Sequence, residues 1–384
     1  MRTSKPVQRL QWGDPAALKL MKENKPVILI GTGLLGGSLK KWGDLEYLSK
    51  HISTEHKFHV YSSAGRFLYV DEDSKKASGQ YVFESEVTKS ELPFKEFCRA
   101  ISKGLSSGSG GRRAGATSAR GGEERDAPRK KVYLQQPLYE GIGEKITNDF
   151  REVPWSWVEN VRTEMRFGPL RINMLLVAEP ETVTPCHYDE QHNLLGCMSG
   201  RKHCILFDPV DFSSLYPFPV FHPADRQSQV NIHRPDEVRF PNFSAARPYT
   251  CCIEPLDLLY IPPYWWHQIE HHKEDSPIVG INFWFQSMPR GADVPATLSS
   301  ATKVSVSRNV EKMVASDLGV SEAAMFWRDV TEESFLCGKA ALRPSTQAYY
   351  DKVLQCLGLL MQPTLVQPFF REMFVDRFRL KMTS

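Results

Sequence analysis

The sequence predicts a mainly β protein whose core is a sandwich or barrel of the jelly-roll type, with helices on its flanks. Between residues 132 and 285, turn residues separate several short segments that are rich in aliphatic and aromatic side chains: VYLQQPL, RINMLLVAE, KHCILFDP, DLLYIPP, HQIEHH and IVGINFWF. Short strands at this spacing are typical of β sandwiches and barrels rather than of alternating β and α units. The chain has 384 residues, contains no internal repeat and lacks a glycine-rich phosphate-binding loop.

The first hundred residues mix helical and strand patterns. ALKLMKEN at residues 16–23 favours a helix, the apolar run at 26–30 favours a buried strand, and residues 44–48 favour another helix. Residues 58–63 and 67–70 are expected to pair as two strands, and helical spacing resumes at 91–105. We therefore expect residues 1–100 to form an α/β segment that packs on the core sheet.

Residues 101–131 differ from the rest of the chain in composition. They are rich in Gly, Ser and Arg, contain no aromatic residue, and carry eight Lys or Arg against three Asp or Glu. Such a segment cannot bury enough apolar surface to offset its ordering entropy, so we expect a flexible surface insertion. The formal net charge of the whole chain is only +3. Since the remainder has no basic excess, nucleic acid is not expected as a partner.

Residues 291–384 are expected to form a helical region. An amphipathic face over residues 306–318 is followed by Gly319 as a helix stop, and two further apolar stretches follow at 349–361 and 365–380. No apolar run reaches the length of a transmembrane helix, and the N-terminal residues lack the apolar core of a signal peptide. We therefore expect a protein of the cytoplasm, and also of the nucleus, that does not bind membranes. The eight cysteines form no C-x-x-C pair, which favours free thiols.

The stretch TPCHYDEQHN at residues 184–193 suggests a metal site. On a strand, alternation places His187 and Asp189 on the same face, whereas residues two apart on a helix face different directions. In WHQIEHH, His267 shares the less polar face with Ile269 and is the natural third ligand. Two His and one carboxylate form the facial triad of non-haem Fe(II) oxygenases, and three ligands exclude a closed structural zinc site. The alternative for His267 is an interior histidine beside two tryptophans.

A buried lysine is expected in RKHCILF. Alternation places Lys202 on the same face as Cys204 and Leu206. An ammonium aimed into an apolar cavity needs an anionic partner, because a bare buried charge costs several kcal/mol. The alternative is a lysine that extends to the rim of the barrel.

Several motifs together resemble a known family. HYDEQHN, DRQSQV, RFPNF, LLYIPPYWWHQIE, NFWF and RNVEKM are similar to the JmjC-type 2-oxoglutarate-dependent oxygenases, in particular to the asparaginyl hydroxylases named for inhibiting hypoxia-inducible factor. The similarity runs from about residue 15 to 289, interrupted by the insertion. It implies a double-stranded β-helix, the cupin or JmjC core, over residues 132–290. It also implies that His187, Asp189 and His267 bind Fe(II).

The resemblance further implies the reaction and the co-substrate residues. The reaction is hydroxylation of the β-carbon of asparagine by O2, coupled to decarboxylation of 2-oxoglutarate to succinate and CO2. Lys202, Tyr133 and Thr184 match residues that hold the distal carboxylate of 2-oxoglutarate. Asn193 and Asn282 match amides that line the co-substrate end of the pocket.

Four more residues match the substrate side of the family's site. Arg226 and Gln227 match the pair that binds the primary amide of asparagine, and a glutamine offers such an amide both a donor and an acceptor. Tyr69 and Trp284 match aromatic residues of the same pocket. Without the resemblance, we would interpret Arg226 and Gln227 as residues of a solvated loop, and the two aromatic residues as part of the core.

The resemblance implies asparagine-containing protein segments as partners, from hypoxia-inducible factor or ankyrin repeats. It also implies a homodimer through C-terminal helices, although the similarity fades past about residue 315. Two other functions stay open. One is another JmjC oxygenase, either a lysyl demethylase or a hydroxylase of another residue. The other is a cupin-like binding protein without turnover.

Overall fold

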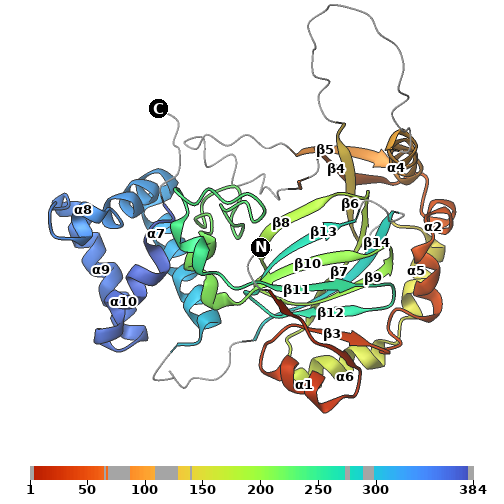
Figure 1. Cartoon of the computed structure of the whole chain (residues 1–384), viewed down its shortest axis with the longest axis horizontal. Helices are drawn as coiled ribbons and strands as arrows, with labels where there is room; N and C mark the ends of the chain where they lie inside the picture. Colours follow the sequence, from red (N-terminus) through yellow and green to blue (C-terminus); the bar gives the residue numbers. More distant parts are fainter. Residues whose placement is uncertain are drawn as a thin grey trace, which may run out of the picture.

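The computed structural model describes residues 4–64, 66–67, 87–108, 129–138, 141–272, 277–288 and 298–378. Two β sheets lie at the centre, with helices around the larger sheet and a helical region at the opposite side (Figure 1). The predicted fold class, a double-stranded β-helix core with flanking and C-terminal helices, is confirmed. Neighbouring strands are antiparallel except for β1 with β11 and β2 with β3.

The two sheets pack face to face around an apolar layer that includes Leu195, Leu206 and Ile269. The smaller sheet has the order β1 (Lys5–Pro6), β11 (Tyr249–Ile253), β10 (Lys202–Phe207), β13 (Trp266–His271) and β8 (Val183–Tyr188). The larger sheet has the order β2 (Arg9–Gln11), β3 (Val27–Ile30), β12 (Leu258–Ile261), β9 (His192–Ser199), β14 (Ile278–Phe285), β7 (Leu170–Ala178), β6 (Lys131–Pro137), β4 (Lys57–Ser63) and β5 (Thr88–Pro93).

Strand β14 shows why the sequences of the core strands are nearly continuous runs of apolar residues. Val279, Ile281 and Phe283 pack into the layer between the larger sheet and its helices. Ile278 belongs to the layer between the two sheets, and Asn282 lines a cavity there. Because both faces are covered, alternation separates two buried environments instead of core from solvent.

The N-terminal segment packs against the larger sheet, and its strands also extend that sheet. Strand β3 pairs with β12, and β4 pairs with β6. The predicted pairing of residues 58–63 with 67–70 is not found among the described residues, because β4 pairs with β5 and β6 and the Phe67 N–H donates to the Val183 carbonyl. Residues 68–70 and most of 101–131 lie outside the described residues. The helices of this part are α1 (Pro15–Lys22), η1 (Gly37–Gly43), α2 (Leu45–His51), α4 (Phe94–Gly108), α5 (Glu144–Arg151) and α6 (Trp155–Met165).

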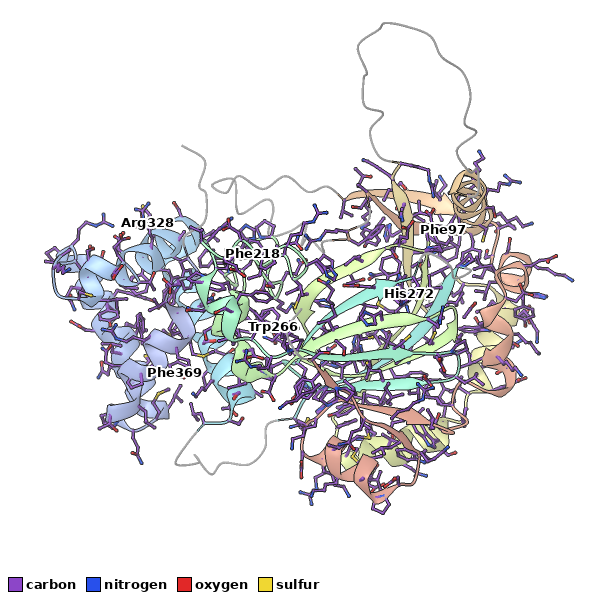
Figure 2. All side chains as sticks on the ribbon, viewed as in Figure 1. Phe97, Phe218, Trp266, His272, Arg328 and Phe369 are labelled. Carbon is purple, nitrogen blue, oxygen red and sulfur yellow. The ribbon has the colours of Figure 1, made fainter. Side chains whose placement is uncertain are left out.

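The C-terminal helices cover the outer face of the smaller sheet. Trp266 of β13 belongs to the same apolar cluster as Trp327 and Phe369, and Figure 2 shows Phe369 within the helical region. The helices are α7 (Ser300–Val330), α8 (Glu333–Leu336), α9 (Pro344–Leu360) and α10 (Pro363–Phe374). The predicted stop at Gly319 is a break inside α7, with φ at 77°, after which the helix resumes. Within the described chain, no single helix is long and apolar enough to cross a membrane, and α9 with α10 passes that test only as a pair bent by 116°.

The segment between β10 and β11 contains η2 (Pro209–Asp211), η3 (Ser213–Leu215) and η4 (Pro241–Ala245), and it buries His222. The Nδ1 atom of His222 accepts a hydrogen bond from the Ala224 N–H at 3.0 Å. Burial lowers the pKa of His222 to about 4.

This buried histidine predicts a loss of stability in acid. Between about pH 6.5 and 4 the unfolded chain binds a proton at His222 while the folded chain does not. The free energy of unfolding therefore decreases as the pH is lowered through this range, by up to about 3 kcal/mol. A His222→Asn variant keeps an acceptor but does not titrate. We expect the urea midpoint of this variant to fall less than that of the wild type between pH 7 and 4.5. Equal falls would contradict the assignment.

Candidate active site

A cavity of about 430 Å³ lies between the two sheets. It gathers the predicted site residues from six strands, β6, β8, β9, β10, β13 and β14, and from two loops. Tyr69 is the exception, because it lies outside the described residues. The predicted residues that line the cavity are Tyr133, Thr184, His187, Asp189, Asn193, Lys202, Arg226, Gln227, His267, Asn282 and Trp284.

Three of these side chains form a compact cluster with the composition of a metal site. His187 on β8 lies opposite His267 on β13, and their ring centroids are 4.2 Å apart. The Oδ2 atom of Asp189 is 3.7 Å from Nε2 of His267. One ligand atom from each residue lies within 4.8 Å of the others. Two imidazoles and one carboxylate at this separation can bind one ion and leave open positions.

Backbone carbonyls fix how both histidines face the cavity. The Nδ1 atom of His187 donates to the Pro185 carbonyl at 2.8 Å, and that of His267 donates to the Trp265 carbonyl at 3.0 Å. A carbonyl can only accept, so each Nδ1 carries a proton, and in the neutral ring the lone pair is then on Nε2, which can bind a metal. This second contact is the usual means by which proteins orient a metal-binding histidine.

The charges of the cluster suit metal binding at neutral pH. Burial, and then the neighbouring His267, lowers the pKa of His187 to about 4, so its imidazole is neutral. Burial opposes ionisation of Asp189, but His187, His267 and Arg226 together hold its pKa below the ordinary value. Metal ligands must be deprotonated before they bind, and His187 and Asp189 already are.

A β-bulge brings Thr184 into the cavity beside His187. His267 pairs with His187, whereas Ile269 pairs with Thr184, so β8 contains one extra residue between the two pairs. Regular alternation would place Thr184 and His187 on opposite faces. Pro185, which has no N–H to donate to the ladder, lies in the bulge, where strands tolerate proline.

One end of the cavity suits a carboxylate. Lys202 is only 1% exposed, and its Nζ lies 3.2 Å from Nε2 of His271. In the part of the chain that the structure describes, no carboxylate forms an ion pair with Lys202. Burial raises the pKa of Tyr133 to about 12, and its hydroxyl is hydrogen-bonded to Thr184. An ammonium beside two neutral hydroxyls is a set of donors that matches one carboxylate.

Unsatisfied polar atoms also fit a bound ligand. Oδ1 of Asn193 and Nε1 of Trp284 are buried, and neither has a hydrogen-bond partner among the described residues. Such atoms are rare in folded proteins because each costs about 1–3 kcal/mol. By contrast, Oδ1 of Asn282 accepts a hydrogen bond from the Met174 N–H of β7 at 3.1 Å, so this oxygen already has a partner within the larger sheet.

Arg226 and Gln227 lie beside the histidine cluster because their loop pairs with β8. The Tyr188 N–H donates to the Arg226 carbonyl at 3.1 Å, and Gln227 forms an antiparallel bridge with His187. Nη1 of Arg226 is 3.4 Å from Oδ1 of Asp189. Arg226 has φ at 67°, a left-handed conformation that costs a non-glycine residue about 1–3 kcal/mol and is often found at functional sites.

Sequence reasoning missed a charged network behind this loop. Arg308 of α7 donates to both oxygens of Asp225 at 2.7 and 2.9 Å, to Oε1 of Glu190 at 2.8 Å, and to the Tyr188 hydroxyl at 3.0 Å. Asp225 precedes Arg226, and Glu190 follows Asp189. The network therefore links a C-terminal helix to both sides of the site. Its one sequence signal was RNVEKM, the motif that Arg308 opens.

His271 was missed as well, although its signal was present. In WHQIEHH, alternation places His271 on the same inner face as His267 and Ile269, and the structure buries it against Lys202.

Comparison with known proteins agrees with this architecture. The model of the cupin-like domain family matches residues 16–291. HSPB1-associated protein 1 of Rattus norvegicus is 32% identical over 157 residues, 40% of this chain and 31% of that protein. Lysine-specific demethylase JMJ31 of Arabidopsis thaliana is 35% identical over 109 residues, 28% of this chain and 19% of that protein. Lysine-specific demethylase 8 of Xenopus tropicalis is 39% identical over 90 residues, 23% of this chain and 20% of that protein. The chain thus spans less than a third of the length of these curated relatives, and none of the three is named as an asparaginyl hydroxylase.

Proposed function

The chain belongs to the cupin-like domain family, and from that premise we propose that it is an Fe(II)- and 2-oxoglutarate-dependent oxygenase that hydroxylates asparagine in protein substrates. The observation that carries the proposal is one cavity lined by a His–Asp–His cluster, a buried lysine and an Arg–Gln pair. Each group suits one reactant. The cluster suits the metal, Lys202 suits a dicarboxylate, and the Arg–Gln pair suits an amide.

His187, Asp189 and His267 would hold Fe(II), and Lys202, Tyr133 and Thr184 would hold the distal carboxylate of 2-oxoglutarate. When bound, the iron and 2-oxoglutarate would activate O2, with release of succinate and CO2 and transfer of one oxygen atom to the substrate. The chain's own residues orient the reactants and exclude water. Such positioning removes much of the entropic barrier to a reaction between several components.

The charge beside the metal ligands supports an amide over a cationic side chain. Arg226 places a guanidinium 3.4 Å from Asp189, and a methylated lysine entering there would meet like charge. Asp225 also lines the cavity, but its two oxygens are already bound by Arg308. A neutral primary amide can accept from Arg226 and both donate to and accept from Gln227.

A lysyl demethylase is the second candidate, because two of the relatives carry that name. The protein would be incubated with Fe(II), 2-oxoglutarate and O2, and with matched peptides followed by mass spectrometry. One set contains asparagine in transactivation-domain or ankyrin-repeat sequences, and the other contains methylated lysine. An Asp189→Ala variant is the control.

We expect one added oxygen on asparagine and none in the control. Loss of methyl groups with release of formaldehyde would replace the proposal with demethylation. Binding of metal and 2-oxoglutarate without succinate from any peptide would favour the non-catalytic binding protein. The homodimer and the cytoplasmic or nuclear location stay predictions.

A further inference from the structure

The end of the Lys202 side chain lies between His271 of β13 and Gly280 of β14. Lys202 on β10 is the direct cross-strand partner of His271 on β13, and its Nζ is 3.2 Å from Nε2 of that ring. On β14, Gly280 leaves the space for the lysine. A Cβ added at Gly280 would stand 2.9 Å from Cε and 3.4 Å from Nζ of Lys202. A side chain at position 280 would therefore displace the end of Lys202 from its place beside His271.

A chain of hydrogen bonds fixes the tautomer of His271. The Thr182 hydroxyl donates to the Glu179 carbonyl at 2.9 Å, so its single proton is already used. Nδ1 of His271 lies 2.5 Å from the same hydroxyl oxygen. Because the hydroxyl has no second proton, Nδ1 must donate the hydrogen bond between them. This leaves Nε2 without a proton, as the acceptor for the Lys202 ammonium. Burial, and then the charge of Lys202, lowers the pKa of His271 well below its ordinary value, so the ring is neutral.

We propose that His271 is a positioning residue that orients the Lys202 ammonium for 2-oxoglutarate without cancelling its charge. This inference rests on the proposed function. A neutral acceptor uses one of the three ammonium donors and leaves two for the distal carboxylate. A carboxylate at position 271 would form an ion pair with Lys202 and compete with the co-substrate. An apolar residue would leave the ammonium without a partner that orients it.

The test is binding of 2-oxoglutarate to the full chain, loaded with Mn(II) and kept free of O2, by calorimetry. Hydrogen bonds to charged groups contribute about 1.5–3 kcal/mol, so His271→Leu should weaken binding about tenfold or more. His271→Glu should weaken it at least as much, although an acceptor is restored. His271→Gln supplies a neutral acceptor and should recover most of the affinity. In turnover, KM for 2-oxoglutarate should rise while kcat changes little.

The matched control is His272→Gln, which alters the exposed neighbouring histidine and should leave binding unchanged. Unchanged Mn(II) affinity in each variant shows that the site is folded. If the Mn(II) affinity of His271→Leu is changed, the role of His271 is tested instead by comparing the affinities of the Gln and Glu variants for 2-oxoglutarate. Equal affinity for 2-oxoglutarate in the wild type and the Glu variant would overturn the role of His271 alone. A wild type that binds Mn(II) but no 2-oxoglutarate would overturn the proposed function as well.

Discussion

Replacing Asp189 with Ala is expected to weaken metal binding by at least about a hundredfold and to remove turnover of 2-oxoglutarate. Even residues that only orient metal ligands typically contribute 10- to 100-fold to affinity, and Asp189 supplies the one carboxylate of the cluster. Its loss also leaves Arg226 beside two imidazoles without the negative charge that it now contacts at 3.4 Å. Mn(II) titration of the purified chain and measurement of succinate would test both effects.

Asp211→Ala is the matched control for this experiment. Asp211 is a buried carboxylate that accepts a hydrogen bond from the backbone N–H of Arg247, and it does not line the cavity. We expect this variant to lose stability and to keep its metal affinity. Metal binding that survives Asp189→Ala unchanged would show that the three side chains are not the metal site.

Arg308→Met is expected to destabilise the fold by about 1.5–3 kcal/mol, the usual contribution of hydrogen bonds to charged groups. Arg308 is buried and binds Asp225 and Glu190, so its removal leaves two carboxylates without their shared cation. The side chains of Asp225 and Glu190 are 21% and 38% exposed, so water partly compensates them when the buried guanidinium is removed. The free energy of unfolding, measured by urea denaturation of both proteins at neutral pH, would test this.

Lys312→Met offers a close comparison. Lys312 also belongs to α7 and lies 3.8 Å from the same Glu190, but half of its side chain is exposed. Exposed pairs contribute about 0–1 kcal/mol, so this variant should be nearly neutral. Arg308→Lys keeps the charge but loses the planar fork that binds both oxygens of Asp225, and we expect an intermediate loss. Equal stability of the Met variants at 308 and 312 would show that the network does not hold the C-terminal helix to the site.

The apolar composition of short segments between turn residues was sufficient to predict the core strands, and local alternation predicted several inward-facing residues. Lys202 and His267 were predicted to face inward because neighbours on the same face are apolar, and both lie in the cavity. Two covered sheet faces leave a strong local signal, since nearly every residue of such a strand is apolar. The JmjC resemblance, rather than alternation, pointed to Arg226 and Gln227, because a loop has no periodicity to read.

What the sequence alone determined was therefore the strand-rich core, the helical C-terminal part and the inward direction of Lys202 and His267. Only the tertiary structure decided where that periodicity breaks and which distant segments meet. The bulge at Pro185 turns Thr184 to the same side as His187, against the alternation of the strand. Glu190 and Arg308 meet although they are 118 residues apart in the chain. Such contacts depend on how whole sheets and helices pack, and a local pattern of side chains carries no information about them.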